Sequence, residues 1–223
     1  MVHCDGLLFQ YPAGEFSLRV ASFEVAEGQS VAIVGPSGCG KSTLLKLIAG
    51  ILVPAEGAIR VADQPLSSLP LPQRQRFRAS RIGMVFQEFE LVDYLSVEDN
   101  ILLPYYLSDG LTLDGSVRER ARTLAAAVGI GDFLPRHPRS MSQGERQRVA
   151  ICRALVTKPG LVLADEPTAS LDPANQTRSV ALLREQSAGV GAALVMVTHD
   201  HGTLAGFDRV VDLGSLVTIT PTV

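Results

Sequence analysis

Residues 30–50 read SVAIVGPSGCGKSTLLKLIAG, and this segment gives the strongest indication of the fold. Residues 30–34 form a continuous apolar run, which is typical of a central strand covered on both faces. Residues 35–42 match G-x-x-x-x-G-K-[ST], the phosphate-binding loop or Walker A motif. Apolar residues recur over residues 43–48 before Gly50, so a helix is expected directly after the loop. The order strand, loop, helix predicts a site for phosphate groups.

The loop supplies the groups that hold a nucleotide. Backbone N–H groups and the positive end of the following helix surround phosphate oxygens in such loops. We expect Lys41 to reach the outer phosphates of ATP and the Ser42 hydroxyl to bind Mg²⁺. The residues expected to contact ATP here are Gly35, Pro36, Ser37, Gly38, Cys39, Gly40, Lys41, Ser42 and Thr43. The alternative is a glycine turn with no ligand, which the flanking strand and helix disfavour.

A second apolar run ends in two carboxylates. Residues 161–164 read LVLA and precede Asp165 and Glu166, which resembles a Walker B motif. Beside a phosphate loop, a strand-end aspartate can hold Mg²⁺ and the next carboxylate can polarise a water for attack on the γ-phosphate. We therefore assign Asp165 to the metal and Glu166 to the general base. The alternative for Glu166 is a surface or helix-capping carboxylate.

The other apolar runs predict an α/β fold. Four further short runs bounded by turn residues indicate strands, at residues 16–20, 58–61, 82–85 and 192–197. The runs that lack polar alternation indicate a parallel sheet covered on both faces.

Between residues 88 and 158 the pattern becomes helical. Ser96 with Asp99, and Ser116 with Glu119, have the spacing of helix-start signals. After Ser116, apolar residues share one helix face: Val117, Ala121, Leu124, Ala125 and Val128.

Composition restricts the function. The 223 residues carry a formal net charge of -3, so no overall positive field attracts nucleic acid, and we expect no nucleic-acid partner. Three cysteines without metal-ligand spacing suggest a reducing compartment. No apolar run approaches the ~18 residues that span a bilayer, so direct membrane insertion is not expected. The basic residues Arg74, Arg76, Arg78 and Arg81 indicate a solvated face, or alternatively an anion or partner contact.

Residues 141–151, MSQGERQRVAI, narrow the class of protein. Alone, this segment would be a serine cap on a basic helix. Beside the two motifs above, it resembles the signature motif of ABC ATPases. Other landmarks follow in the family order: Gln87 is similar to the Q-loop glutamine, Ser170-Leu171-Asp172 to the D-loop, Thr198-His199-Asp200 to the switch histidine, and Tyr11 to the aromatic that stacks on adenine.

The resemblance implies a P-loop NTPase (RecA-like) core with an N-terminal antiparallel β subdomain and an inserted α-helical signature subdomain. Residues 1–87 and 159–223 would form the core and residues 88–158 the insertion, within one domain. It also implies that Gln87 contacts Mg²⁺ and the attacking water and that His199 contacts the γ-phosphate. The residues that would complete the ATP site of a second subunit are Ser142, Gly144, Glu145 and Asp172. The expected assembly is a dimer around two ATP·Mg²⁺.

Two motifs depart from the family pattern. The signature has Met141 and Gln143 where leucine and glycine are usual, and the D-loop reads ASLD rather than SALD. Ser142 and Gly144, the phosphate-binding positions, are kept.

A subgroup is also indicated. Residues 82–87, IGMVFQ, and 96–100, SVEDN, resemble the lipoprotein-release, macrolide-export and cell-division group of ABC ATPases. This resemblance implies a separate transmembrane permease subunit and a peripheral position at the cytoplasmic face of the inner membrane. The alternative is a regulatory module that signals through a membrane partner without transport. Soluble ABC proteins of DNA repair or translation would carry coiled-coil insertions or two cassettes, which are not seen here.

The segment after Gln87 is expected to bind the membrane partner. Residues 88–107 are dense in apolar and aromatic side chains, and part of this set should stay exposed as a docking groove. These residues are Phe89, Leu91, Val92, Tyr94, Leu95, Leu102, Leu103, Tyr105 and Tyr106. The alternative is that all of them are buried within the subunit.

Overall fold

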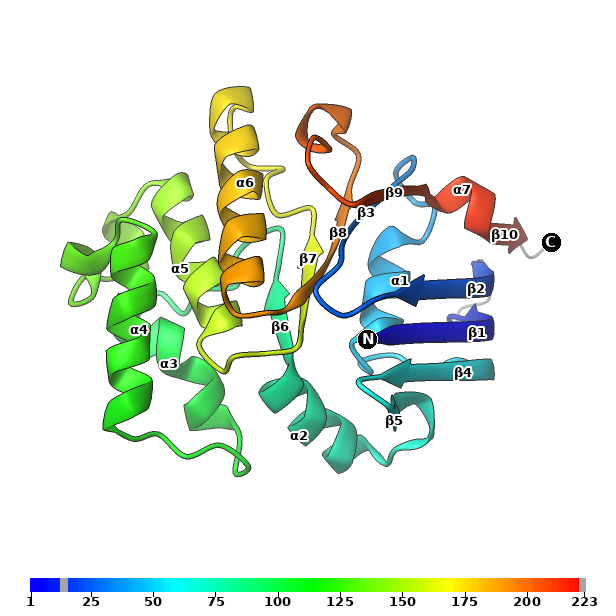
Figure 1. Cartoon of the computed structure of the whole chain (residues 1–223), viewed down its shortest axis with the longest axis horizontal. Helices are drawn as coiled ribbons and strands as arrows, with labels where there is room; N and C mark the ends of the chain where they lie inside the picture. The colour runs from blue at the N-terminus through cyan, green and yellow to red at the C-terminus, as the bar shows by residue number, and fades with distance from the viewer. Residues whose placement is uncertain (13–15, 221–223) are drawn as a thin grey trace.

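The computed structural model describes residues 1–12 and 16–220, with the side chains of 173, 174 and 216–220 left aside. A five-stranded parallel sheet lies at its centre (Figure 1). The strand order is β6 (Ile82–Val85), β7 (Leu161–Asp165), β8 (Ala193–Thr198), β3 (Ser30–Val34) and β9 (Arg209–Asp212). Strands β7, β8 and β3 occupy the middle of the sheet, as their apolar sequences predicted.

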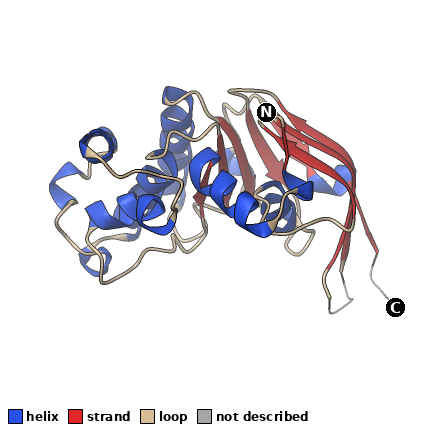
Figure 2. Ribbon diagram, turned by 90° about the horizontal axis from the view of Figure 1, so that it is seen from below, coloured by secondary structure: helices blue, strands red, loops and turns tan. Residues whose placement is uncertain are grey.

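A second sheet is antiparallel. Its order is β10 (Val217–Thr220), β2 (Ser17–Val25), β1 (Val2–Gln10), β4 (Glu56–Val61) and β5 (Gln64–Pro65). It lies beside the parallel sheet, at the opposite end of the molecule from most of the helices (Figure 2). The six expected strands are therefore confirmed, and so is the fold class with its antiparallel β subdomain.

The parallel sheet separates two apolar cores. Along β7, Leu161 and Leu163 face the core shared with α1 (Lys41–Ile48) and the antiparallel sheet, while Val162 and Ala164 face the helices. The helices on that second side include α5 (Gln143–Leu155) and α6 (Pro173–Gly189). Each large apolar side chain that is buried in this way contributes about 1.5–3 kcal/mol. Two-sided burial fixes the carboxyl ends of β3, β7 and β8, where the site lies.

The remaining helices are α2 (Leu71–Arg81), α3 (Val97–Leu107), α4 (Gly115–Ala127), the short α7 (Leu213–Leu216) and the 3₁₀ turns Leu66–Ser68, Gly131–Phe133, Pro138–Ser140 and His201–Thr203. Of these helices, α3 and α4 lie on the side away from the antiparallel sheet, whereas α7 lies beside that sheet (Figure 1). Of the described residues, none belongs to a helix long and apolar enough to cross a bilayer.

One of the two expected helix starts is correct. Ser96 caps α3, because its hydroxyl accepts a hydrogen bond from the Asp99 N–H at 3.0 Å. The expected start at Ser116 is wrong, because Asp114 caps α4 instead and accepts from the Val117 N–H at 3.0 Å. Ser116 donates to the Asp114 carboxylate at 2.7 Å and so supports that cap. The expected apolar stripe of α4 is buried, which fixes the helix against its neighbours.

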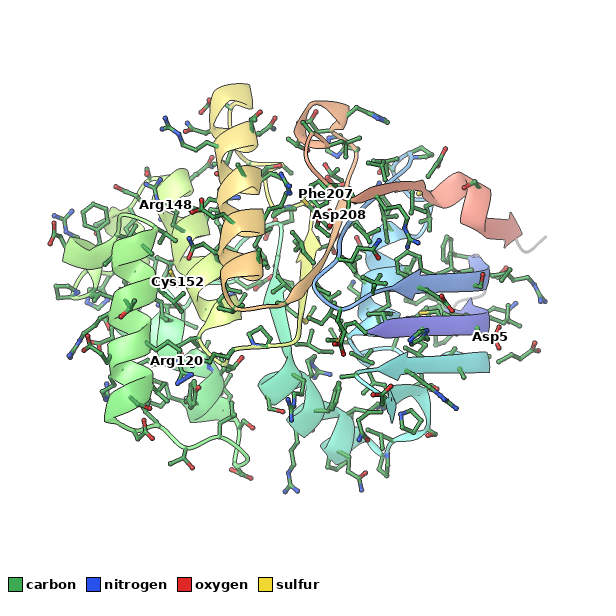
Figure 3. The ribbon with its side chains drawn as sticks, in the orientation of Figure 1. Asp5, Arg120, Arg148, Cys152, Phe207 and Asp208 are labelled. Carbon is green, nitrogen blue, oxygen red and sulfur yellow. The ribbon has the colours of Figure 1, made fainter. Side chains whose placement is uncertain are left out.

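All three cysteines are buried free thiols. Figure 3 shows Cys152 on α5 within the helical half of the molecule. Burial raises the pKa of Cys4 and of Cys152 to about 12, so both remain thiols at neutral pH.

Candidate active site

The phosphate loop joins β3 to α1. Gly40 stands at the start of the helix with φ 97°, a left-handed conformation that glycine adopts at little cost. A Cβ there would lie 2.9 Å from side-chain atoms of Leu18 and Phe16. Since glycine brings no capping oxygen, the first N–H groups of α1 stay open to an anion. The expected loop and helix are therefore present with the geometry that a phosphate needs.

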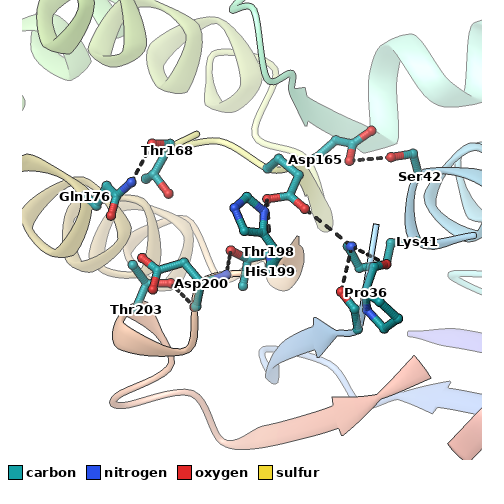
Figure 4. A network of polar contacts seen from close by, with 12 residues as sticks. Pro36, Lys41, Ser42, Asp165, Thr168, Gln176, Thr198, His199, Asp200 and Thr203 are labelled. Carbon is teal, nitrogen blue, oxygen red and sulfur yellow. Dashed lines mark hydrogen bonds and ion pairs between the residues drawn. The ribbon is translucent and has the colours of Figure 1, made fainter. Parts of the chain in front are cut away.

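Lys41 is buried beneath this loop. Its Nζ donates to the carbonyl oxygens of Gly35 and Pro36 at 2.9 and 3.1 Å. The same Nζ lies 3.5 Å from Oε1 of Glu166, so the lysine charge is paired with the predicted general base (Figure 4). Incoming phosphate oxygens would replace these partners, because they carry more negative charge than a carbonyl.

Glu166 is the centre of the polar network. Its Oε2 lies 2.7 Å from Nδ1 of His199 and accepts from the His199 backbone N–H at 3.3 Å. The backbone of Glu166 is left-handed, with φ 46°, and its N–H donates to the carbonyl of Val197 at 3.0 Å. Such strain persists only where surrounding contacts hold it, and it gathers at functional sites. Lys41 and His199 therefore both contact the carboxylate of Glu166. The roles predicted for these three residues require this proximity.

Asp165 and Ser42 form the candidate metal site. The Ser42 hydroxyl donates to Oδ1 of Asp165 at 2.8 Å. Burial raises the pKa of the Asp165 carboxyl above its ordinary value, while the Ser42 hydrogen bond and Lys46 act in the opposite direction. A hydroxyl and a desolvated carboxylate are hard oxygen ligands of the kind that Mg²⁺ prefers. These residues therefore fit Mg²⁺.

Replacing Asp165 with asparagine tests this fit. The stability that protonated Asp165 contributes is lost as the pH rises through its raised pKa, so at neutral pH its charge is unfavourable without a cation. Asp165→Asn should raise the melting temperature of the nucleotide-free chain by roughly 2 °C and remove the stabilisation by MgATP. In the wild type, that stabilisation should weaken as the pH falls toward the raised pKa, because protons compete with the metal. Thermal unfolding with and without MgATP measures both, and a variant still stabilised by MgATP as strongly as the wild type would contradict the assignment.

A cavity of about 360 Å³ lies over the loop. Its lining includes Gln87, Glu166, Tyr11, Phe16 and residues of the phosphate loop. The Tyr11 hydroxyl lies 3.2 Å from Thr43 Oγ1, and the Tyr11 ring packs edge-on against Phe9 with centroids 4.8 Å apart. Adenine stacking on Tyr11 stays a prediction. Phe16 was missed as a cavity residue because its sequence position indicated only a strand.

The signature and D-loop residues lie outside this cavity. Ser142 caps α5 and accepts from the Glu145 N–H at 3.4 Å, while the Glu145 carboxylate accepts from the Ser142 N–H at 2.7 Å. This second bond is the main cause of the lowered pKa of Glu145. Asp172 caps α6 and accepts from the Asn175 N–H at 3.2 Å. With Gly144, these residues form helix starts and do not line the chain's own site.

A phosphate loop between β3 and α1, with two carboxylates at the end of β7, identifies a nucleotide hydrolase of the P-loop class. The chain belongs to the ABC transporter family, whose model matches residues 18–169. The lipoprotein-releasing system ATP-binding protein LolD of Pseudomonas fluorescens is 40% identical over 224 residues, 98% of each chain. The macrolide export ATP-binding/permease protein MacB of Rhodopirellula baltica is 39% identical over 215 residues, which cover 95% of this chain and 31% of that protein.

A solved structure supports the same assignment. The dimeric post-hydrolysis state of the ATP-binding cassette MJ0796, bound to ADP and Pi, has a TM-score of 0.83 at 30% identity, over 100% of this chain and 99% of that one. The chain is thus an ATP-binding subunit and an ATPase of the ABC type, as the sequence predicted.

Proposed function

We propose that this ATPase works as a dimer around two ATP·Mg²⁺ and drives a separate membrane subunit of the lipoprotein-release or macrolide-export type. It would be held at the cytoplasmic face of the inner membrane through that subunit. The observation that carries the hydrolytic part of the proposal is the meeting of Lys41 and His199 on Glu166, beside the Ser42–Asp165 pair. The relatives named for lipoprotein release and macrolide export favour transport over the regulatory alternative.

The chain's own residues can carry out hydrolysis in the following way. The γ-phosphate of ATP draws Lys41 away from the Gly35 and Pro36 carbonyls and from Glu166. Glu166, released from that ion pair, accepts the proton of the attacking water, while His199 holds its carboxylate in place. Mg²⁺, held by Ser42, Asp165 and Gln87, would offset the charge on the outer phosphates.

A second chain completes each site. The N-terminus of α5 is exposed, and its Ser142–Glu145 capping box holds two of its backbone N–H groups; the helix dipole there favours an anion presented from outside this subunit. The γ-phosphate bound by one chain would meet Ser142, Gly144 and Glu145 of the other. Asp172 would lie at the same contact between chains.

A groove lies beside the segment that was expected to dock the membrane subunit. A cavity of about 700 Å³ lies between α2, β6, the end of α3 and α5. We call it the α2–α3 groove; its lining includes Arg76, Arg78, Met84, Phe86, Glu90, Leu103, Pro104, Leu107 and Arg153. Part of the set of nine apolar and aromatic residues was expected to stay exposed; of that set Leu103 lines this groove, and Phe89 and Leu102 are buried in the core. The alternative of complete burial is wrong, because Tyr94 and Tyr106 are exposed.

We propose that the α2–α3 groove receives a cytoplasmic helix of the membrane subunit. Leu107, at the groove, is 76% exposed, and Leu71 at the start of α2 is 53% exposed. A partner that covered these leucines would bury apolar surface. Arg76 and Arg78 on α2 add positive charge to one wall. A short amphipathic helix with apolar residues and an acidic side chain matches this lining.

Leu107→Asp should abolish this docking. The charge would be desolvated in an apolar contact, whereas ATP binding, which lies elsewhere, should be unchanged. Tyr94→Asp is the matched control, because Tyr94 is 81% exposed and lies outside the groove. Tagged variants would be purified from detergent-solubilised membranes and their partners identified by mass spectrometry. We expect a membrane protein with few spanning helices with the wild type and the control only. Full retention by Leu107→Asp would contradict the groove assignment.

A further inference from the structure

Arg153 connects the signature helix to the loop that follows Gln87. It lies in the last turn of α5 and is 8% exposed. One terminal nitrogen of its guanidinium donates to the carbonyl of Phe89 and the other to the carbonyl of Glu90. A single side chain therefore joins the helix that begins after Ser142 to the loop that begins at Gln87.

The loop that accepts these bonds is strained. Phe89 and Glu90 both have left-handed backbones, with φ 61° and 50°, although neither is glycine. Adjacent left-handed residues of this kind persist only where surrounding contacts hold them. Phe89 is also anchored, because its ring is buried in the core that contains α5. The Arg153 guanidinium supplies the polar part of the same attachment.

Keeping a charge at this place has an energetic cost. Burial lowers the pKa of Arg153 to about 10, which is still above neutrality, so the guanidinium remains charged. Arginine alone presents a rigid planar fork that can donate to two neighbouring carbonyls at once. An apolar residue would pack α5 without this cost. We therefore infer that the guanidinium of Arg153 has a role other than packing, which is to hold the Phe89 and Glu90 carbonyls.

We propose that Arg153 is a positioning residue for ATP hydrolysis, which fixes the Gln87 loop to α5 so that Gln87 and the signature end of the helix move as one body. Arg153 and Glu90 also line the α2–α3 groove, so an occupant of the groove contacts the same attachment. Docking of the membrane subunit would thereby change the position of Gln87, because Arg153 holds the loop that follows it. This inference rests on the proposed role of Gln87 at the catalytic site.

Arg153→Lys tests the inference with the charge retained. An ammonium cannot hold both carbonyls in the geometry of the fork. We expect kcat to fall by roughly tenfold or more, the Mg²⁺ concentration for half-maximal activity to rise, and the Kd for ATP to stay unchanged. Purely structural loss would lower the melting temperature without this separation of kcat from ATP binding. Arg153→Lys with wild-type kcat and wild-type Mg²⁺ dependence would overturn the proposal.

Arg184→Lys is the matched control. Arg184 on α6 also donates to two consecutive carbonyls, those of Ala205 and Gly206, and stacks over Phe207, which Figure 3 labels. Arg184 lies outside the candidate catalytic cavity, so the kcat of the Arg184→Lys variant should stay at the wild-type value. An equal fall of kcat in both variants would overturn the positioning role of Arg153.

Hydrogen exchange of the wild-type chain gives a second test that needs no variant. If Arg153 joins the two segments, the amides of residues 87–91 and those of the last turn of α5 should gain protection together on binding MgATP. Free exchange of residues 87–91 beside a protected α5 would count against the attachment. A wild-type chain that fails to hydrolyse ATP would instead reject the proposed function, so the two failures can be distinguished.

Discussion

Glu166→Gln is expected to lower the rate of ATP hydrolysis by ~10² to 10⁴ while ATP binding is kept. The amide has the shape of the carboxylate but cannot accept the proton of the attacking water, and that step contributes roughly 2.7 to 5.5 kcal/mol to the barrier. The ion pair of Glu166 with Lys41, at 3.5 Å, is also lost, which leaves the lysine free for the phosphate. The variant should therefore accumulate as an ATP-bound dimer.

Phosphate release and gel filtration in MgATP measure these two effects. Glu119→Gln is a suitable control, because the Glu119 side chain on α4 is 72% exposed and its ion-pair partner is Arg122 on the same helix. The control should hydrolyse ATP like the wild type and elute like it. If Glu166→Gln released phosphate at the wild-type rate, the general base would have to be sought elsewhere in the cavity.

Local motifs allowed the candidate catalytic residues to be predicted. The phosphate loop and the carboxylates after β7 are contiguous in sequence, and an apolar strand with no polar alternation places the residue after it at the sheet edge. The network around Glu166 could not be predicted in the same way. Its distances to Lys41 and His199 depend on the parallel order of β7, β8 and β3, which is set by tertiary packing.

Other elements were missed for identifiable reasons. Helix α2 has no fully buried side chain and therefore no apolar stripe from which a helix could be predicted. Its arginines were noticed in the sequence only as a basic stretch. Arg78 donates to the Ala49 carbonyl at 3.4 Å and also lines the groove, so whether this stretch contacts an anion or a partner stays a prediction. Strand β1 was hidden because Gly6, with φ 56°, lies where its pairing with β4 shifts register. At α4, Asp114 and Ser116 are both good capping residues, and sequence alone did not choose between them.

The position of the α2–α3 groove could not be predicted without three-dimensional information. Residues 88–107 are apolar enough for an interface, but the sequence does not tell which of them pack into the subunit. Phe89 is buried at a left-handed turn of the chain, whereas Leu103 and Leu107 line the α2–α3 groove from the α3 side. The groove therefore combines segments that are remote in sequence.

Mixing two inactive variants is expected to restore ATPase activity if each site is shared between chains. Lys41→Met disables the phosphate loop of one chain, and Gly144→Asp places a carboxylate where the γ-phosphate of the other chain should bind. A Cβ at Gly144 would meet no atom within 4 Å, so the substitution should leave the chain's own fold intact. Each variant alone should lose activity by ~10² or more, since charge repulsion or a missing cation acts directly on the phosphate.

A mixed dimer contains one intact site, made from the phosphate loop of the Gly144→Asp chain and the signature helix of the Lys41→Met chain. An equal mixture that exchanges freely should therefore recover about a quarter of the wild-type sites. Gly115→Asp is the matched control, because Gly115 also begins a helix and a Cβ there meets no atom within 4 Å. This control should be active by itself. A mixture no more active than its components, although dimers form, would show that Gly144 acts within its own chain and would remove the physical basis for the shared site.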